Sequence, residues 1–411
     1  MPANIFEKSC NNASNQLHTH FANESFSLYF SHTIRTFAQS LTGIFLPLYI
    51  FGLANKPELY VNEFTNNLAW VFIYYIFRSI SVLLFITPAT NVIFGKINFK
   101  ASIFISNIAV SLSLIFILFA DKYFWLILPT AIAASFDIMF YWIPFHLFFI
   151  RKSQSPNGHF GKQFGIRLFL TKIASALGPM IGGVLIISLG FSPLFLLSIL
   201  LMLSSILPLI FSMEDHRHGK HNAYLIFKKY ICEKSLFGVS TAFSVIAFED
   251  VVYSIIWPLL LLSLTDSFAE IGLITTVSIS VSALFAIYIG KRIDIHGSRF
   301  IHKIGITFNS IFYFIRFITN QTSLAFILDI GDKINGSLYG VPFNAKTYDI
   351  AKNNHYDSDF MIYRVIIMHL TIACGLFIML IFLPVIDNYK ILFIVLGIIT
   401  PLTYLIHIKK K

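Results

Sequence analysis

The stretch that decides the fold is Gly165 to Gly183, which reads GIRLFLTKIASALGPMIGG. Ala174, Gly178 and Gly182 recur every four residues, so in a helix they lie on one face with almost no side chain. Such a face lets a second helix approach closely, which is how apolar helices associate in lipid. Pro179 removes one backbone donor and predicts a bend or a flexible point. The stretch therefore predicts a closely packed membrane helix.

The composition places this helix in a polytopic membrane protein. Hydrophobic residues make up 56% of the 411 residues and charged residues 12%, whereas a soluble domain has roughly 45–50% and about 25%. The mean hydropathy is +0.74. The cysteines form no CxxC pair, so we expect neither a disulfide framework nor a metal site. The net charge of +10 is not gathered in a basic stripe with interleaved aromatics, so we expect no nucleic-acid partner.

A helix needs about 20 apolar residues to cross a bilayer, and the chain offers twelve such segments. They are 27–53, 68–90, 100–120, 123–150, 163–189, 191–212, 236–264, 268–290, 300–318, 322–345, 359–386 and 389–408. The polar connection 213–235 divides them six and six. We therefore predict an all-α integral membrane protein with two six-helix pseudo-repeat bundles. Its parts are an N-terminal tail (1–26), the first bundle (27–212), a linker (213–235), the second bundle (236–408) and a C-terminal tail (409–411).

Lysine and arginine indicate the orientation of these helices. Most basic loop residues fall on one side of the membrane, and the other side has only Lys56, Lys122 and Lys390. Because basic loops stay inside, both tails and the linker are predicted to be cytoplasmic. A chain rich in Ile, Phe, Lys and Asn suggests an AT-rich genome, and we expect a bacterial inner membrane.

A short repeat supports two halves. Tyr141–His146 (YWIPFH) matches Tyr339–Asn344 (YGVPFN), and each is followed by an arginine early in the next predicted helix, Arg167 and Arg364. Chance is the alternative, but the matched arginines favour a duplication. Two parallel six-helix halves are the architecture of a facilitator-type transporter.

With these elements placed, the chain resembles the major facilitator superfamily of secondary transporters over residues 27–408. The loop between the eighth and ninth predicted helices fits the family pattern G-x-x-x-D-x-x-G-x-[RK] at Gly290, Asp294, Gly297 and Arg299. Gly297 permits a tight turn, and Asp294 can form a charge-assisted latch with the arginines. A generic basic turn is the alternative reading of this loop.

The opening stretch is similar to the family's fifth-helix antiporter signature, G-x8-G-x3-G-P-x2-G-G, at Gly165, Gly178, Pro179, Gly182 and Gly183. Ala174 replaces one glycine, and a helix-packing face is the simpler interpretation. Two departures argue against proton-coupled drug export. Val92 stands at the acidic position of the loop between helices two and three. The fourth helix has Asp137 and lacks the arginine usual in such exporters.

Ionisable residues also occur deep inside the predicted helices. We place seven near the midplane: Arg78, Asp137, Glu249, Asp250, Asp332, Lys333 and His369. Arg35, Lys172 and Asp329 lie somewhat off it, whereas His32, Arg167, Arg316 and Arg364 are placed close enough to an interface to snorkel. Each central charge costs about 2.5–3.5 kcal/mol unless it faces a partner or a cavity. The set therefore predicts an aqueous binding cavity.

We assign substrate binding to Arg35, Arg78, Asp137, Asp332 and Lys333, and proton coupling to Asp137, Glu249 and Asp250. Desolvated carboxylates hold a proton readily, and Glu249 and Asp250 are adjacent, so at most one faces the cavity directly. Asp329 and Lys333 are four residues apart and can equally well neutralise each other. His146 and His369 are expected to be hydrogen-bonded core residues.

The predicted function is secondary transport of a small solute by alternating access, with proton-coupled export as one mode. An organic-anion or metabolite facilitator is an alternative. A lipid-modifying transferase would place its catalytic residues at the interface, whereas these acids are central. A receptor or scaffold would leave the two halves unexplained. We expect a monomeric non-enzyme without cofactor, whose partners are its solute, membrane lipid and protons. No Gly-rich loop followed by Lys-Ser/Thr is present, which argues against ATP-driven transport.

Overall fold

A computed structural model describes residues 27, 30–152, 160–211, 221–296, 298–353, 357–386 and 388–408, and this part of the chain contains helices and no strand. The first helix covers residues 30–43. The others are α2 (Leu46–Gly52), α3 (Glu63–Gly95), α4 (Phe99–Leu118), η1 (Phe124–Leu126), α5 (Ile127–Asp137), η2 (Ile138–Trp142), α6 (Ile143–Lys152), α7 (Phe160–Leu189), α8 (Phe191–Ser204), η3 (Leu207–Phe211), α9 (Ala223–Ile231), η4 (Lys234–Leu236), α10 (Phe237–Thr265), α11 (Phe268–His296), α12 (Ser298–Ile318), α13 (Thr322–Asn353), α14 (Asp357–Phe382), η5 (Leu383–Val385), α15 (Ile391–Ile399) and η6 (Thr400–His407).

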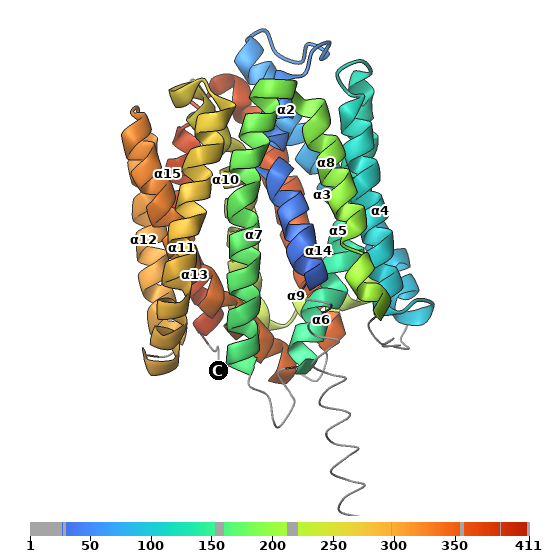
Figure 1. Ribbon diagram of the computed structural model, residues 1–411. Helices are drawn as coiled ribbons and strands as arrows, with labels where there is room; N and C mark the ends of the chain where they lie inside the picture. Colours follow the sequence, from blue (N-terminus) through green and yellow to red (C-terminus); the bar gives the residue numbers. More distant parts are fainter. Residues whose placement is uncertain are drawn as a thin grey trace, which may run out of the picture.

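Figure 1 shows the long helices standing side by side in one bundle. Helices α4, α5 and α8 lie on one side, α11 and α12 on the other, and α7 stands in front between them. Short polar caps separate several of these helices. Asn62, Asn98 and Asn222 each accept a hydrogen bond from the backbone N–H three residues on, and so begin α3, α4 and α9.

Nine helical stretches of the described chain are long and apolar enough to cross a membrane. They coincide with nine of the predicted segments, and the chain is a multi-pass membrane protein. The predicted segments 300–318, 322–345 and 389–408 coincide with α12, α13 and the pair α15–η6, which do not reach the same length and apolarity. Charged residues such as Arg316 and Asp332 lower the hydropathy of α12 and α13.

Two predicted helices are interrupted. The segment 27–53 turns at residues 44–45, and α2 restarts with Pro47 in its first turn. The segment 123–150 contains η2, a π-helical turn, immediately before Pro144. Because proline cannot donate its backbone hydrogen bond and crowds the preceding turn, a local change of helix type accommodates it.

Helix α7 runs unbroken from Phe160 to Leu189 through Pro179. Its small residues contact two helices. A Cβ on Gly178 would meet Ser40 of the first helix, and a Cβ on Gly182 would lie 2.5 Å from the carbonyl oxygen of Leu41. A Cβ on Gly183 would lie 2.3 Å from the carbonyl oxygen of Phe268, the first residue of α11. The predicted packing face is therefore confirmed where Gly178 and Gly182 meet the first helix. Gly183 gives α7 a second close contact, with α11.

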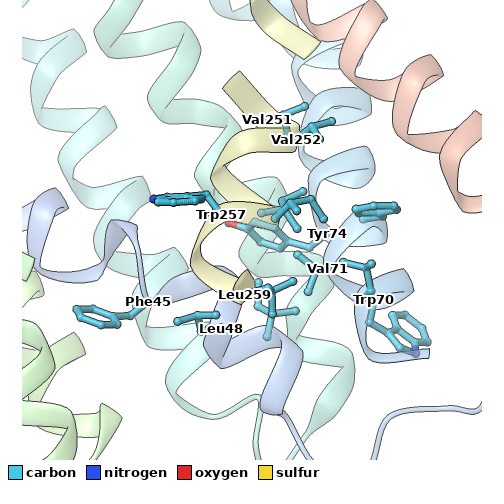
Figure 2. Packing of buried hydrophobic residues seen from close by; sticks show 14 of the residues in the cluster. Phe45, Leu48, Trp70, Val71, Tyr74, Val251, Val252, Trp257 and Leu259 are labelled. Carbon is cyan, nitrogen blue, oxygen red and sulfur yellow. The ribbon is translucent and has the colours of Figure 1, made fainter. Parts of the chain in front are cut away.

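The largest buried cluster joins residues that precede and follow the linker. Figure 2 shows Leu48 of α2 and Val71 of α3 packed near Val251 and Leu259 of α10, with Trp257 close by. All five are at most 6% exposed. Such close-packed interiors transmit movement between helices, and this cluster connects the first three helices to α10.

Candidate functional site

The first group of buried charges lies within residues 30–211. Arg35 is 0% exposed and forms an ion pair with Asp137, which is 5% exposed. Arg35 also donates to Asn107 and lies over the ring of Tyr141, 3.9 Å from its centroid. Ser106 donates to Asp137 at 2.8 Å. The guanidinium and the carboxylate thus compensate each other inside the helix packing, which leaves little room for a solute between them.

The second group lies within residues 221–408. Arg316 is 0% exposed and its guanidinium is 3.1 Å from the Asp332 carboxylate. Tyr253 donates to Asp332 at 3.0 Å, and Trp257 donates to Asp329 at 2.8 Å. The guanidinium of Arg316 also faces the rings of both aromatic residues, 4.6–4.8 Å from their centroids. This arrangement fixes the charges of α12 and α13 against α10.

Lys333 extends this second group. Its Nζ is 3.8 Å from Asp329 and 3.7 Å from Asp332, and Tyr253 accepts from it at 3.5 Å. The predicted pairing of Asp329 with Lys333 is therefore present, but its distance is long. Lys333 is half-buried, and its three contacts are all at 3.5–3.8 Å.

Glu249 and Asp250 occupy neighbouring positions in the middle of α10 but have opposite surroundings. Glu249 is 1% exposed and accepts hydrogen bonds from Thr400 and, at 2.5 Å, from Tyr339. Asp250 is exposed, and its electrostatic neighbours are Arg364 and Asp332. Only one of the two adjacent carboxylates therefore faces an accessible space, as their spacing along the helix predicts.

Three further cations lie at the boundary between the two parts of the chain. Arg78 of α3 is half-buried, and its Nε has no hydrogen-bond partner among the described residues. Among the described residues, the Nζ of Lys172 of α7 hydrogen-bonds to two serine hydroxyls, Ser282 and Ser337, both at 3.1 Å. Arg364 of α14 is 8% exposed, and its Nε and one terminal nitrogen are also without a partner in the described chain. We call Arg78, Lys172, Asp250, Lys333 and Arg364 the central charged layer.

At each end of the bundle, beyond the central charged layer, a side chain connects the two parts of the chain. At the end where the linker lies, the Nδ1 of His221 is 2.7 Å from the carboxylate of Asp359 of α14. The backbone N–H of His221 donates to the side-chain oxygen of Asn91 of α3 at 2.9 Å. At the opposite end, Tyr60 donates to the carbonyl of Leu380 at 2.7 Å. Each bridge connects residues before the linker with residues after it.

The structure corrects the predicted direction of three side chains. His32, Arg316 and Arg364 were expected to reach an interface, but they are 7%, 0% and 8% exposed. Sequence spacing gives depth along a helix and not the direction of a side chain, so these groups point into the helix packing. His146 and His369 are hydrogen-bonded as expected, to Tyr348 at 2.7 Å and Ser79 at 3.2 Å.

Four residues of the two family motifs lie outside the described residues or side chains: Gly165, Gly290, Asp294 and Gly297. The side chain of Arg167, the repeat partner of Arg364, also lies outside them. Arg299 is described and exposed, and it donates to Tyr404 at 2.8 Å. The predicted latch with Asp294 therefore stays a prediction.

An open groove on the described part of the chain lies away from the charges. It has a volume of about 390 Å³ between α4 and α5 and is lined only by apolar or aromatic residues such as Ile108, Leu112 and Phe136. Ile108 and Leu112 are themselves exposed, at 36% and 42%. An apolar, accessible groove of this kind suits lipid chains and not a charged solute.

No protein-family model matches the chain, and no curated protein matches its sequence. Solved structures do match. A POT family transporter in complex with 5-aminolevulinic acid aligns with a TM-score of 0.69 at 12% identity, over 93% of this chain and 95% of the other. The chain has the fold of these transporters. A POT family transporter in complex with a thioalcohol-conjugated peptide aligns with a TM-score of 0.63, again at 12% identity and with the same coverage.

The POT family belongs to the major facilitator superfamily, so the predicted fold is confirmed at that level. Both matched proteins are described as transporters. Sequence reasoning placed Lys172 and Arg364 in the membrane but gave them no role. What distinguishes both residues is a cationic side chain with few hydrogen-bond acceptors around it. The sequence cannot show this, because the acceptors belong to neighbouring helices.

Proposed function

We propose that this chain is a secondary transporter that moves a small solute by alternating access. The observation that supports it best is the central charged layer, in which Lys333 of α13 acts on Lys172 of α7 and Arg364 of α14 acts on Asp250 of α10. Charge at membrane depth is costly unless it faces a cavity or a ligand. The bridges of His221 and Tyr60 lie at opposite ends, and each has to open in turn for a solute to pass.

We propose that the transport unit comprises twelve spanning helices in two halves, residues 27–212 and 236–408, with both termini and the linker in the cytoplasm of a bacterial cell. The repeat supports this division. Tyr141 hydrogen-bonds to His32 of the first helix, and Tyr339 donates to Glu249 of α10, the first long helix after the linker. Matched tyrosines thus contact matched helices. We expect the protein to act as a monomer in lipid.

Among the assigned substrate residues, Arg78, Asp332 and Lys333 are partly accessible, whereas Arg35 and Asp137 are sequestered in their ion pair. We therefore propose that the first three contact the solute and that the Arg35–Asp137 pair stabilises the first half. For proton coupling, the geometry favours Glu249 and Asp250 over Asp137. Glu249 forms no ion pair with the described residues, and a buried carboxylic acid of this kind can release and rebind a proton as its surroundings change. Asp250 is exposed, and the charge of Arg364 acts on it.

Flux into proteoliposomes with an imposed pH gradient tests this proposal. Glu249→Gln should abolish pH-driven accumulation but keep solute exchange at equal pH, because the amide has nearly the same shape, its oxygen can still accept from one hydroxyl and its NH2 can donate to the other. Asp349→Asn, at an exposed residue of α13, is the matched control. Full coupling in Glu249→Gln and Asp250→Asn would refute the proton assignment. Absence of any flux from the wild-type protein would refute transport.

We propose export as the direction of transport. The antiporter-like face of α7 favours export in exchange for protons, and its packing against the first helix and α11 suits a seal between moving halves. An organic-anion or metabolite facilitator is the second candidate, favoured by the surplus of cations in the central charged layer. Reversing the pH gradient distinguishes them, because a facilitator without coupling responds to neither direction.

A further inference from the structure

Lys172 has an incomplete set of partners. Its Nζ donates to Ser282 of α11 and Ser337 of α13, each at 3.1 Å, and no described carboxylate lies within ion-pair distance. Both serines are buried, at 1% and 4% exposure. Hydroxyls supply hydrogen bonds but no charge, so a half-buried ammonium at membrane depth remains uncompensated.

A charge of the same sign acts on Lys172. It is the ammonium of Lys333, which lies one helical turn from Ser337 on α13 and therefore on the same face. Lys333 is 3.8 Å from Asp329 and 3.7 Å from Asp332, but both acids are also engaged elsewhere, Asp332 by Arg316 and Asp329 by Trp257. Lys172 itself thus has two serine hydroxyls and a like charge as its neighbours, and no carboxylate of the described residues pairs with it.

We propose that Lys172, Lys333, Ser282 and Ser337 form a binding site for the anionic group of the transported solute, a carboxylate or a phosphate. This inference rests on the proposed transport function and names the chemistry of its substrate. Two ammonium groups and two hydroxyls supply charge-assisted and neutral donors around one cluster of oxygens. An anion between them also removes the repulsion of Lys172 and Lys333.

The site joins the two parts of the chain. Lys172 comes from α7, whereas Ser282, Ser337 and Lys333 come from α11 and α13. Helices α7 and α11 also touch through Gly183, whose Cβ would meet the backbone of Phe268. An anion bound there therefore contacts helices from both parts of the chain.

The experiment uses the purified full-length protein in nanodiscs, with succinate, inorganic phosphate and uncharged glycerol as probes at constant ionic strength. Thermal stabilisation and calorimetry should show binding of succinate or phosphate and none of glycerol. Lys172→Gln should weaken anion binding about tenfold or more, because the variant loses the charge of one ammonium group. A tenfold loss corresponds to about 1.4 kcal/mol. Lys172→Arg should restore part of it, and Lys303→Gln, at an exposed residue of α12, should leave it unchanged.

A second measurement needs no ligand. Because Lys172 is an uncompensated charge, Lys172→Met should raise the apparent Tm of the empty protein, whereas loss of a structural ammonium would lower it. A lowered Tm, or anion binding that is the same in Lys172→Gln and wild type, overturns the site. So does a wild-type protein that binds neither anion. Preference between succinate and phosphate identifies the anion's class.

Flux separates this inference from the proposed function. If the wild-type protein binds anions through Lys172 but transports none of them, the site stands and the proposed transport of this solute fails. If it transports a neutral or cationic solute independently of Lys172, transport stands and the anion site fails.

Discussion

The buried pair of Arg35 and Asp137 offers the sharpest test of the reasoning. Asp137→Asn removes the negative charge and keeps the shape of the side chain. Arg35 then remains 0% exposed, with Asn107, Ser106, the sulfur of Met202 and the ring of Tyr141 around its guanidinium. None of these groups carries a charge, so the cation is left uncompensated.

The expected loss follows from the burial of both partners. Removing one partner of a buried ion pair costs about 3–5 kcal/mol. At about 2–4 °C for each kcal/mol in a domain of 150–250 residues, this predicts an apparent Tm lowered by roughly 6 °C or more. The double variant Arg35→Met with Asp137→Leu should recover most of that loss, because apolar side chains of similar volume often replace a buried pair without penalty.

The assay is thermal unfolding of the purified protein in one fixed detergent or lipid. Asp349→Asn is the control, since it breaks an exposed pair with Lys346 at 3.1 Å that is worth about 0–1 kcal/mol. Equal Tm values for Asp137→Asn and Asp349→Asn would refute the structural role. Unchanged stability together with lost solute binding would support the assignment of Arg35 and Asp137 to substrate binding that the sequence predicted.

Three further predictions concern the packing, the buried acid and the linker. Gly182→Ala should lower the free energy of unfolding by about 1–3 kcal/mol through overpacking, because the added Cβ would lie 2.5 Å from a backbone oxygen. Gly43→Ala is the control and should leave the Tm unchanged, because its Cβ would meet nothing within 4 Å. Tyr339→Phe removes the 2.5 Å hydrogen bond to Glu249 and should lower the Tm by an amount equivalent to about 1–3 kcal/mol; an unchanged Tm would show that another donor takes its place. His221→Ala removes a bridge between α3 and α14, so a cysteine-accessibility assay should find the linker end of the bundle more often open; equal accessibility would contradict a gating role.

The predictions for individual residues succeeded where one helix was sufficient. Small residues spaced by four predicted the packing face of α7, and the adjacency of Glu249 and Asp250 predicted that only one would be accessible. They failed where two helices were needed. Arg316 was placed near an interface, yet it is fully buried and paired with Asp332.

The sequence by itself determined the class of protein and the positions of its helices, because the cost of unpaired backbone groups in lipid makes each apolar segment of about 20 residues a helix. It also determined which charges lie deep, since depth depends only on the rise along one helix. The tertiary structure decided which of those charges are compensated. Arg35 meets Asp137, whereas Lys172 meets only two serines. The physical reason is that a helix's rotation about its own axis depends on its neighbours' packing, and that rotation selects the partner of every buried charge.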